Sequence, residues 1–267
     1  MRESLSLYLA YVGISIRAQM QYRWSAMMRT AAQFLGIGAE ALALWALFQR
    51  FGHLYGWRAG EVAVLYGVVN MGFALAECIG RGFDMFPALV RSGDFDRLLL
   101  RPRSTLLQVS AAELDVRAGR LLQGLIVLAW GSGQLGLDWS ILRVLLVLWT
   151  VLGGMLVFIG LFVLQATLSF WTVDGLEVLN ALTYGGTETA QFPLTIYPRW
   201  FRGIFIFAIP LGAISYFPML VLLGRHDELL GLPPWGCVLM PACGPIFLAA
   251  TLCLWQVGVR HYRSTGS

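Results

Sequence analysis

The chain has 267 residues, of which 58% are hydrophobic and only 13% are charged. An average soluble domain carries roughly 25% charged residues, so this chain has too little polar surface to cover a soluble globule, and a soluble catalytic domain is excluded. The formal net charge of +4 is typical of a membrane protein with basic cytoplasmic loops and implies no nucleic-acid partner. We interpret the chain as an all-α integral membrane protein that spans the lipid bilayer.

The N-terminal residues 4–22 contain the apolar run LSLYLAYVGISI, which is too short for a span of about 20 residues. Arginines lie before and after this run, and Tyr8, Tyr11, Tyr22 and Trp24 suit the headgroup level. This pattern predicts an amphipathic helix in the plane of the membrane interface. Five later segments are predicted to be transmembrane helices: residues 30–48, 62–79, 121–137, 141–170 and 235–257.

Residues 172–223 contain the remaining span of a six-helix chain. Hydropathy alone makes residues 203–223 the fifth span and leaves residues 172–202 as a cytoplasmic segment. Pro210 and Pro218 argue against this arrangement, because each removes a backbone donor from a straight helix.

The arginines are distributed unequally between the two sides of this six-span model. Four of them, Arg50, Arg58, Arg143 and Arg225, fall on one side, and the other fifteen of the nineteen basic residues fall on the opposite side. Because cytoplasmic loops carry the excess of positive charge, we expect both termini and the arginine-rich residues 91–103 in the cytoplasm.

The most polar stretch in the middle of the chain is residues 86–108. Gly93 can break a helix and Pro102 ends one, which predicts a structured loop at the membrane face. Phe95 and the adjacent leucines would contact something in the aqueous phase. The alternative is an ordinary cytoplasmic loop whose arginines only fix the topology. The charged side chains of residues 86–108 are Arg91, Asp94, Asp96, Arg97, Arg101 and Arg103.

Polar side chains within the predicted spans are a second group of candidates. A charged group at membrane depth costs about 2.5–3.5 kcal/mol on insertion scales, so such residues often mark function. Glu40 lies near the centre of the first span, and it would line a substrate path or pair with an arginine of a partner. The alternative is a structural hydrogen bond between helices, with the carboxyl group protonated. Asn70 and Glu188 are the other candidate pathway residues, and Glu77 lies near a span end.

Two stretches of the chain, taken in their order along the sequence, resemble segments in the membrane subunit of a bacterial type-2 ABC exporter, of the daunorubicin-exporter kind. The first, GDFDRLLLRPRS at residues 93–104, has the family's glycine, polar pair, leucine-rich turn and proline between the second and third spans. The second, FPLTIYPRWF at residues 192–201, is similar to the segment after the fifth span. Pro210 and Tyr216 stand where the family often has an Asn-Pro and a tyrosine, but Ile209 replaces the asparagine.

The resemblance implies a permease of the bacterial inner membrane that works with two ABC ATPase subunits and a second permease copy or a related permease. ATP and Mg²⁺ would bind to the ATPase, so no cofactor and no enzymatic activity are expected in this chain. Charges in the loop would set the register of docking, and Phe95 or the leucines would fill a pocket. The implied docking residues are Arg91, Gly93, Asp94, Phe95, Asp96, Arg97, Leu98, Arg101 and Pro102.

The resemblance also favours a different arrangement of the fifth span. It places this span at residues 175–196 and makes residues 197–223 a pair of short helices that dip into the outer leaflet and turn back near Pro210. Such a broken element is tolerated where it is buried against protein. This arrangement moves Arg199 and Arg202 to the outer side, against the positive-inside bias.

Two other classes of function stay open at this point. A membrane-embedded enzyme acting on lipids or isoprenoids would use paired carboxylates such as Asp94 and Asp96, although the neighbouring arginines would neutralise them. An ion-coupled secondary carrier would need more than six spans and repeated halves. The four cysteines lie in apolar runs and the three histidines are scattered, so no metal site is predicted.

Overall fold

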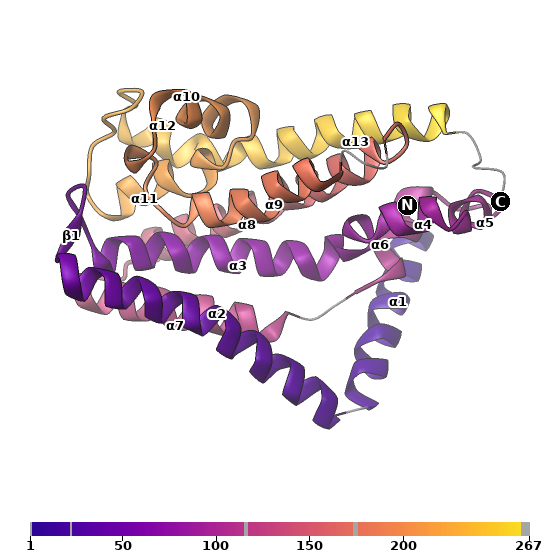
Figure 1. The fold of residues 1–267 in the computed structure, drawn as a ribbon, viewed down its shortest axis with the longest axis horizontal. Coiled ribbons are helices and arrows are strands. Elements are labelled where there is room, and N and C mark those ends of the chain that lie inside the picture. Colours follow the sequence, from indigo (N-terminus) through magenta and orange to yellow (C-terminus); the bar gives the residue numbers. More distant parts are fainter. Residues whose placement is uncertain (1, 22, 115–116, 173–175, 263–267) are drawn as a thin grey trace.

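The computed structural model of the protein describes residues 2–21, 23–114, 117–172 and 176–262. Long helices run back and forth along one axis (Figure 1). The first and last described residues of the chain and the short helices α4 (Phe86–Arg91) and α5 (Asp94–Leu99) lie at one end of the bundle, which we call the termini end. A small antiparallel hairpin of β1 (His53–Leu54) and β2 (Trp57–Arg58) lies at the other end, the hairpin end.

The first helix, α1 (Arg2–Gln21), lies across the bundle axis rather than along it (Figure 1). Helix α2 (Arg23–Phe51) then runs to the hairpin end. The side chains of Ser15 and Gln19 hold α1 to the loop before α7, because both donate hydrogen bonds to the carbonyl oxygen of Leu114, at 3.0 and 2.7 Å. The transverse direction of α1 suits an in-plane helix, and its placement at a membrane surface stays a prediction.

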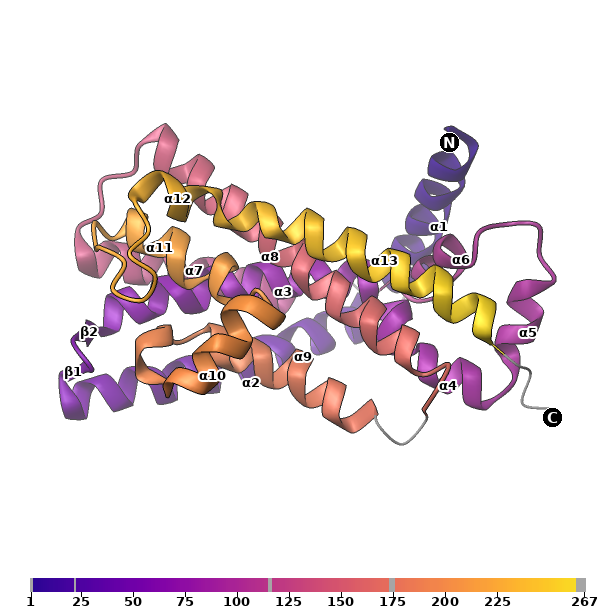
Figure 2. The ribbon, with the colours of Figure 1, turned by 90° about the horizontal axis from the view of Figure 1, so that it is seen from above.

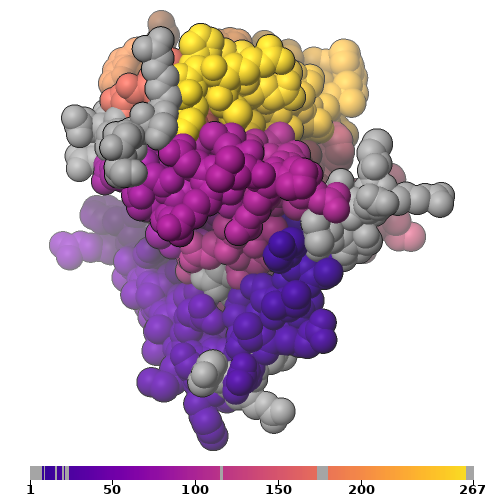
Figure 3. Space-filling model, turned by 90° about the vertical axis from the view of Figure 1, so that its right-hand side faces the viewer, coloured from indigo at the N-terminus to yellow at the C-terminus, as the bar shows by residue number. Residues whose placement is uncertain are grey.

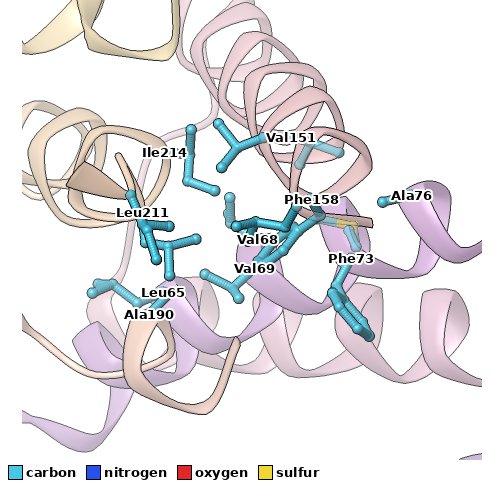
Figure 4. Packing of buried hydrophobic residues seen from close by; sticks show 14 of the residues in the cluster. Leu65, Val68, Val69, Phe73, Ala76, Val151, Phe158, Ala190, Leu211 and Ile214 are labelled. Carbon is cyan, nitrogen blue, oxygen red and sulfur yellow. The ribbon is translucent and has the colours of Figure 1, made fainter. Parts of the chain in front are cut away.

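Helix α3 (Ala59–Asp84) is the centre of the bundle. In its most apolar stretch 83% of the residues are buried, against 17% in α2. A helix that is apolar all round is one that other helices cover. Figure 4 shows Leu65, Val69 and Phe73 of α3 packed among side chains of α8 and of the segment near α11. Helices α7 (Ala118–Leu135), α8 (Ile141–Leu168) and α9 (Leu176–Ala190) surround α3.

Glycines bring α3 and α7 close together. Gly60 and Gly67 of α3 face Gly131 and Gly124 of α7, so two seven-residue spacings match in an antiparallel register. A Cβ atom at Gly67 would lie 2.7 Å from the carbonyl oxygen of Gly124 and 2.8 Å from Cβ of Leu128. Small residues at such contacts let helix backbones approach each other in a membrane, where dispersion contacts replace the hydrophobic effect.

The chain after α9 turns repeatedly at the hairpin end before it returns in one long helix (Figure 2). Residues Arg199–Ala208 and Gly212–Leu222 form two helical arms bent by 72° at a break around Pro210, which has no N–H to donate. The elements of this part are η1 (Leu194–Ile196), α10 (Arg199–Gly203), the π-helical turn η2 (Ile204–Ala208), η3 (Gly212–Ile214), α11 (Tyr216–Leu222), α12 (Pro234–Leu239), η4 (Met240–Ala242) and α13 (Cys243–His261).

Four helices of the described residues are long and apolar enough to cross a membrane, and a fifth is counted if the bent pair is one broken span. The all-α prediction is therefore confirmed in its coarse form. The predicted spans at residues 121–137 and 175–196 overlap α7 and α9, which do not reach this standard, so the count of six crossings stays a prediction. The four helices are Trp24–Phe51, Ala59–Arg91, Ile141–Leu168 and Pro234–His261.

Candidate functional site

The polar segment at residues 86–108 folds into three short helices, α4, α5 and α6 (Thr105–Ala112), instead of an irregular loop. Gly93 joins α4 to α5 with φ of 73°, in the left-handed region that favours glycine. Ser104 starts α6, because its hydroxyl accepts a hydrogen bond from the backbone N–H of Leu107. Figure 3 shows this segment in magenta across the middle of the termini end, between α13 and the N-terminal helices.

The outer surface of α5 and the turn that follows carries leucines among charged side chains. Leu100 is 86% exposed and Leu99 is 42% exposed. Arg97 and Asp94 form an exposed ion pair at 3.3 Å, and the hydroxyl of Ser92 donates to Asp94 at 2.8 Å. The structure thus displays an apolar tip within alternating charges, which we call the docking turn (residues 93–103).

Phe95 is the exception among the residues predicted to meet a partner. Its side chain has no exposed surface, and its ring packs 4.9 Å from Phe86 and 4.9 Å from Tyr262, measured between ring centroids. The sequence predicted that Phe95 or the leucines would fill a partner's pocket. In this structure only the leucines are placed to do so, since Phe95 lies inside the chain's own core.

A buried ion cluster joins α3 to the start of α7. The carboxylate of Glu77 lies 3.1 Å from Arg120 and 3.3 Å from Arg117, and the side chain of Glu77 is 6% exposed. The guanidinium group of Arg120 also lies over the ring of Phe73, 4.7 Å from its centroid. Sequence reasoning placed Glu77 near a span end but missed its partners, because about forty residues separate them along the chain.

Glu40 is exposed on α2 and lines the rim of a polar cavity of about 330 Å³. The hydroxyl of Tyr66 lies 3.1 Å from the carbonyl oxygen of Ile37 and 3.5 Å from Oε2 of Glu40. The cavity therefore brings together residues of α2 and α3 and the arginines near the start of α7. Its lining is Gln33, Gly36, Ile37, Glu40, Glu77, Arg117 and Arg120.

The other two predicted pathway residues lie in different surroundings. Glu188 is exposed on α9 and interacts electrostatically with Glu40 and Arg120. Asn70 is fully buried in α3, and its amide donates to the backbone oxygen of Tyr66 at 3.0 Å. The structure thus leaves Glu40 and Glu188 exposed on α2 and α9, the two helices whose exposed sides we call the open face, and it places Asn70 inside the bundle with a hydrogen bond within α3.

A polar cap closes the hairpin end of the bundle. The guanidinium group of Arg225 lies 2.8 Å from Glu61 and 4.2 Å from the centroid of the Trp57 ring, and it donates to the carbonyl oxygen of Gly56 at 2.7 Å. The indole N–H of Trp57 donates to Thr195 at 3.0 Å. These contacts tie the hairpin to α3, to η1 and to the loop after α11.

A larger cavity, of about 740 Å³, lies between α3, α7 and α8. Its lining includes Met71, Leu128 and Val151, and no charged side chain is among the residues that form it. It therefore offers mainly apolar contact, and Ser132 and Trp139 are the residues of its lining that carry a polar side-chain group. Within the described residues, no three His, Cys, Asp or Glu side chains gather in a way that could hold a metal ion.

Comparison with protein families gives one match. The family model described as "ABC-2 family transporter protein" matches residues 34–266, which include the docking turn, both arms of the bent pair and every residue of the polar cavity's lining except Gln33. No curated protein and no solved structure matches the chain.

Proposed function

Because the chain belongs to the ABC-2 family of transporter membrane proteins, we propose that it is the permease subunit of an ATP-driven exporter. Members of this family are multi-pass membrane components that typically work with an ABC ATPase and are not themselves catalytic. The chain would form the substrate path, and the partner would bind ATP and Mg²⁺ and hydrolyse the nucleotide. The observation that carries this proposal, beyond the family, is the exposed docking turn at the termini end.

The docking turn has the properties of a small interface for a soluble partner. Leu99 and Leu100 supply the apolar centre, and the exposed arginines and Asp94 supply a charged rim. In such interfaces a buried apolar contact gives most of the affinity, whereas rim charges set the orientation and the rate of association. We infer that this turn binds the ATPase in the cytoplasm, as the excess of arginines at this end favours.

The open face between α2 and α9 is where we place the substrate path. Glu40 and Glu188 are both exposed there, within segments that we assign to the membrane. Leaving two carboxylates toward lipid is costly, and the cost is removed if a second permease copy covers this face and encloses an aqueous path. The complex would then contain two permeases and two ATPases.

The bent pair supports a re-entrant element at the outer side of the membrane. Its two arms meet at Pro210, and Arg225 just after α11 is tied to Glu61 at the hairpin end. This arrangement makes α9 the fifth span and puts Arg199 outside. A single cysteine at Arg199, in a chain whose four native cysteines are replaced, should react with an impermeant maleimide added to intact cells. Labelling only after the cytoplasmic face is opened would overturn the re-entrant arrangement.

Co-purification tests the central proposal. An affinity-tagged chain, expressed in its native host, should bring down an ABC ATPase. Leu100→Asp should abolish this association, because it places a charge at the apolar tip of the docking turn. Leu230→Asp is the matched control, since Leu230 is a 40% exposed leucine at the hairpin end, and it should retain the ATPase. Equal recovery of the ATPase with both variants would contradict docking at this turn.

A further inference from the structure

Helix α5 turns one side chain inward. Phe95 is fully buried, whereas the neighbouring Leu99 and Leu100 point to solvent. The Phe95 ring makes near-perpendicular contacts with Phe86 and Tyr262, both at 84°, and a tilted contact with Phe170 at 5.5 Å. Perpendicular ring pairs are a favoured geometry because the positive ring edge meets the negative face. An aromatic cluster on the buried side of α5 therefore fixes the position of the docking turn.

The rings of this cluster come from elements far apart in sequence. Phe170 is the second residue after α8, and Tyr262 directly follows α13. Trp255 of α13 completes the cluster, with its ring 4.9 Å from Phe86 and 5.3 Å from Phe170. Every ring contact of Phe95 in the described part of the chain is with α4 or with the residues that follow α8 and α13.

Helices α8 and α13 themselves pack closely along their length. A Cβ atom at Gly160 of α8 would lie 2.7 Å from the ring of Phe247, and one at Gly258 of α13 would lie 2.6 Å from the ring of Phe170. Near the other end of the pair, a Cβ at Gly153 would lie 2.7 Å from the carbonyl oxygen of Pro241. Interiors packed this tightly move as units rather than deform continuously.

Polar contacts of Tyr262 and Trp255 lie beside the aromatic cluster. Burial, and then the nearby carboxylate of Asp96, raise the pKa of Tyr262, so this side chain stays a neutral phenol at physiological pH. The indole N–H of Trp255 donates to the hydroxyl of Thr105 in α6 at 3.3 Å. Together with the ring contacts of Phe86 and Phe95, this bond joins all three helices of the polar segment to the C-terminal part of α13 and the residue after it.

We propose that Phe95 is the positioning residue that couples the docking turn to the α8–α13 pair, so that the turn and this pair move as one body when the ATPase changes state. This inference rests on the proposed function. The open face of α2 would then change shape by movement of the α8–α13 body relative to α2, and the docking turn would not act on α2 directly. Phe95 acts here through its neighbours, since it has no exposed surface that could meet the ATPase.

Pulsed electron paramagnetic resonance can test this assignment in the complex with the co-purified ATPase. Spin labels at Ser92 and Arg260 report the position of the docking turn against α13, and labels at Ser92 and Met28 report the turn against α2. All three positions are exposed, and Ser92 directly precedes the docking turn without belonging to it. Between the nucleotide-free and the ADP-vanadate-trapped complex, the first distance should stay constant and the second should change. A shift in the first distance as large as that in the second would overturn the proposal.

Variants of Phe95 distinguish a positioning role of this side chain from a contribution to stability alone. Phe95→Ala should keep the ATPase bound, because Leu99 and Leu100 remain, but the Ser92–Arg260 distance should become broad and nucleotide-dependent. Phe95→Leu, which retains apolar volume, should restore most of the constant distance, and Phe51→Ala, at an exposed phenylalanine that ends α2, should leave it unchanged. A constant distance in Phe95→Ala would overturn the role of Phe95. If no ATPase co-purifies, or neither distance responds to nucleotide, the proposed function itself fails and this inference falls with it.

Discussion

Helices α7 and α2 both lie against α3, but they are packed in opposite ways. Two glycines of α7, Gly124 and Gly131, pack against α3, so that a Cβ atom at Gly124 would lie 3.0 Å from the carbonyl oxygen of Gly67. Gly36 and Gly38 of α2 have nothing within 4 Å of such an atom. The same residue type therefore marks a close helix contact between α7 and α3 and an unfilled surface on α2.

The acidic residues show the same contrast. Glu77 is buried between two arginines, whereas Glu40, on the opposite wall of the same cavity, is exposed. Together the two comparisons divide the bundle into a body of α3, α7, α8 and α13 and an open face on α2 and α9. The body is packed within one chain, and the open face is the surface that we propose a partner covers.

The largest difference in folding is expected between two leucine substitutions, one at a glycine packed between α3 and α7 and one at a glycine on the unfilled surface of α2. Gly67→Leu would force a side chain into the backbone of α7, where even a Cβ atom would lie 2.7 Å from the carbonyl oxygen of Gly124, so that α3 and α7 could not keep their close contact. We expect little folded protein by size-exclusion chromatography in detergent. Gly36→Leu is the matched control, because the same change meets open space, and it should fold while weakening association with a second copy.

The opposite folding behaviour of the two variants would contradict the division of the bundle into a body and an open face. If Gly36→Leu loses the folded chain and Gly67→Leu does not, α2 belongs to the body, and the close approach of Gly67 to Gly124 is not what holds α3 to α7.

Removing the carboxylate of Glu77 should have the next largest effect. Glu77→Gln leaves the half-buried Arg117 and Arg120 without their shared acid, and breaking a buried pair in this way costs about 3–5 kcal/mol. Asp94→Asn is the control, since its pair with Arg97 is exposed and such pairs contribute about 0–1 kcal/mol. Thermal unfolding of both variants in the same detergent measures the difference. Equal melting temperatures would mean that the Glu77 cluster adds no stability to the body.

Much of the body was predictable from sequence, and the reason is physical. Helices α3 and α8 are apolar for long enough that hydropathy alone locates their ends to within about five residues. Helix α7 is harder, because Gln123 and Ser132 lower its mean hydropathy although both are buried in the bundle. Hydropathy averages over a helix and does not record which side chains face protein.

The candidate site was predictable only in part. Gly93 and Pro102 identified the docking turn, since both residues restrict the backbone locally. The inward direction of Phe95 was not predictable, because its neighbours Phe170 and Tyr262 lie 75 and 167 residues further along the chain. The pairing of Glu77 with Arg117 and Arg120 was missed for the same reason. Local patterns locate such residues, but contacts between distant elements decide their roles.

A change in the polar cap at the hairpin end should have an intermediate effect on the free energy of unfolding. Arg225→Gln removes an ion pair with Glu61 and the contact over Trp57, while Gln can keep one hydrogen bond. Hydrogen bonds to charged groups contribute about 1.5–3 kcal/mol, and Arg225 is one-third exposed, so we expect a loss of about 1–2 kcal/mol in the free energy of unfolding. Arg143→Gln, at a surface arginine that bonds only a backbone oxygen, is the control. A full loss of folding in Arg225→Gln would place the cap within the body.

The smallest effect on stability is expected at Glu40. Its carboxylate is exposed, and its nearest polar contact is the 3.5 Å approach of the Tyr66 hydroxyl, so Glu40→Gln should change the free energy of unfolding by less than about 0.5 kcal/mol, as for surface sites in general. Its effect should appear instead in assembly or turnover. If the open face closes on a second copy, the ATPase rate of the reconstituted complex should change in Glu40→Gln. It should not change in Glu228→Gln, the same substitution at an exposed loop at the hairpin end. A Glu40→Gln complex with unchanged assembly and unchanged ATPase rate would mean that the open face lies against lipid, and that this carboxyl group is held there only by Tyr66.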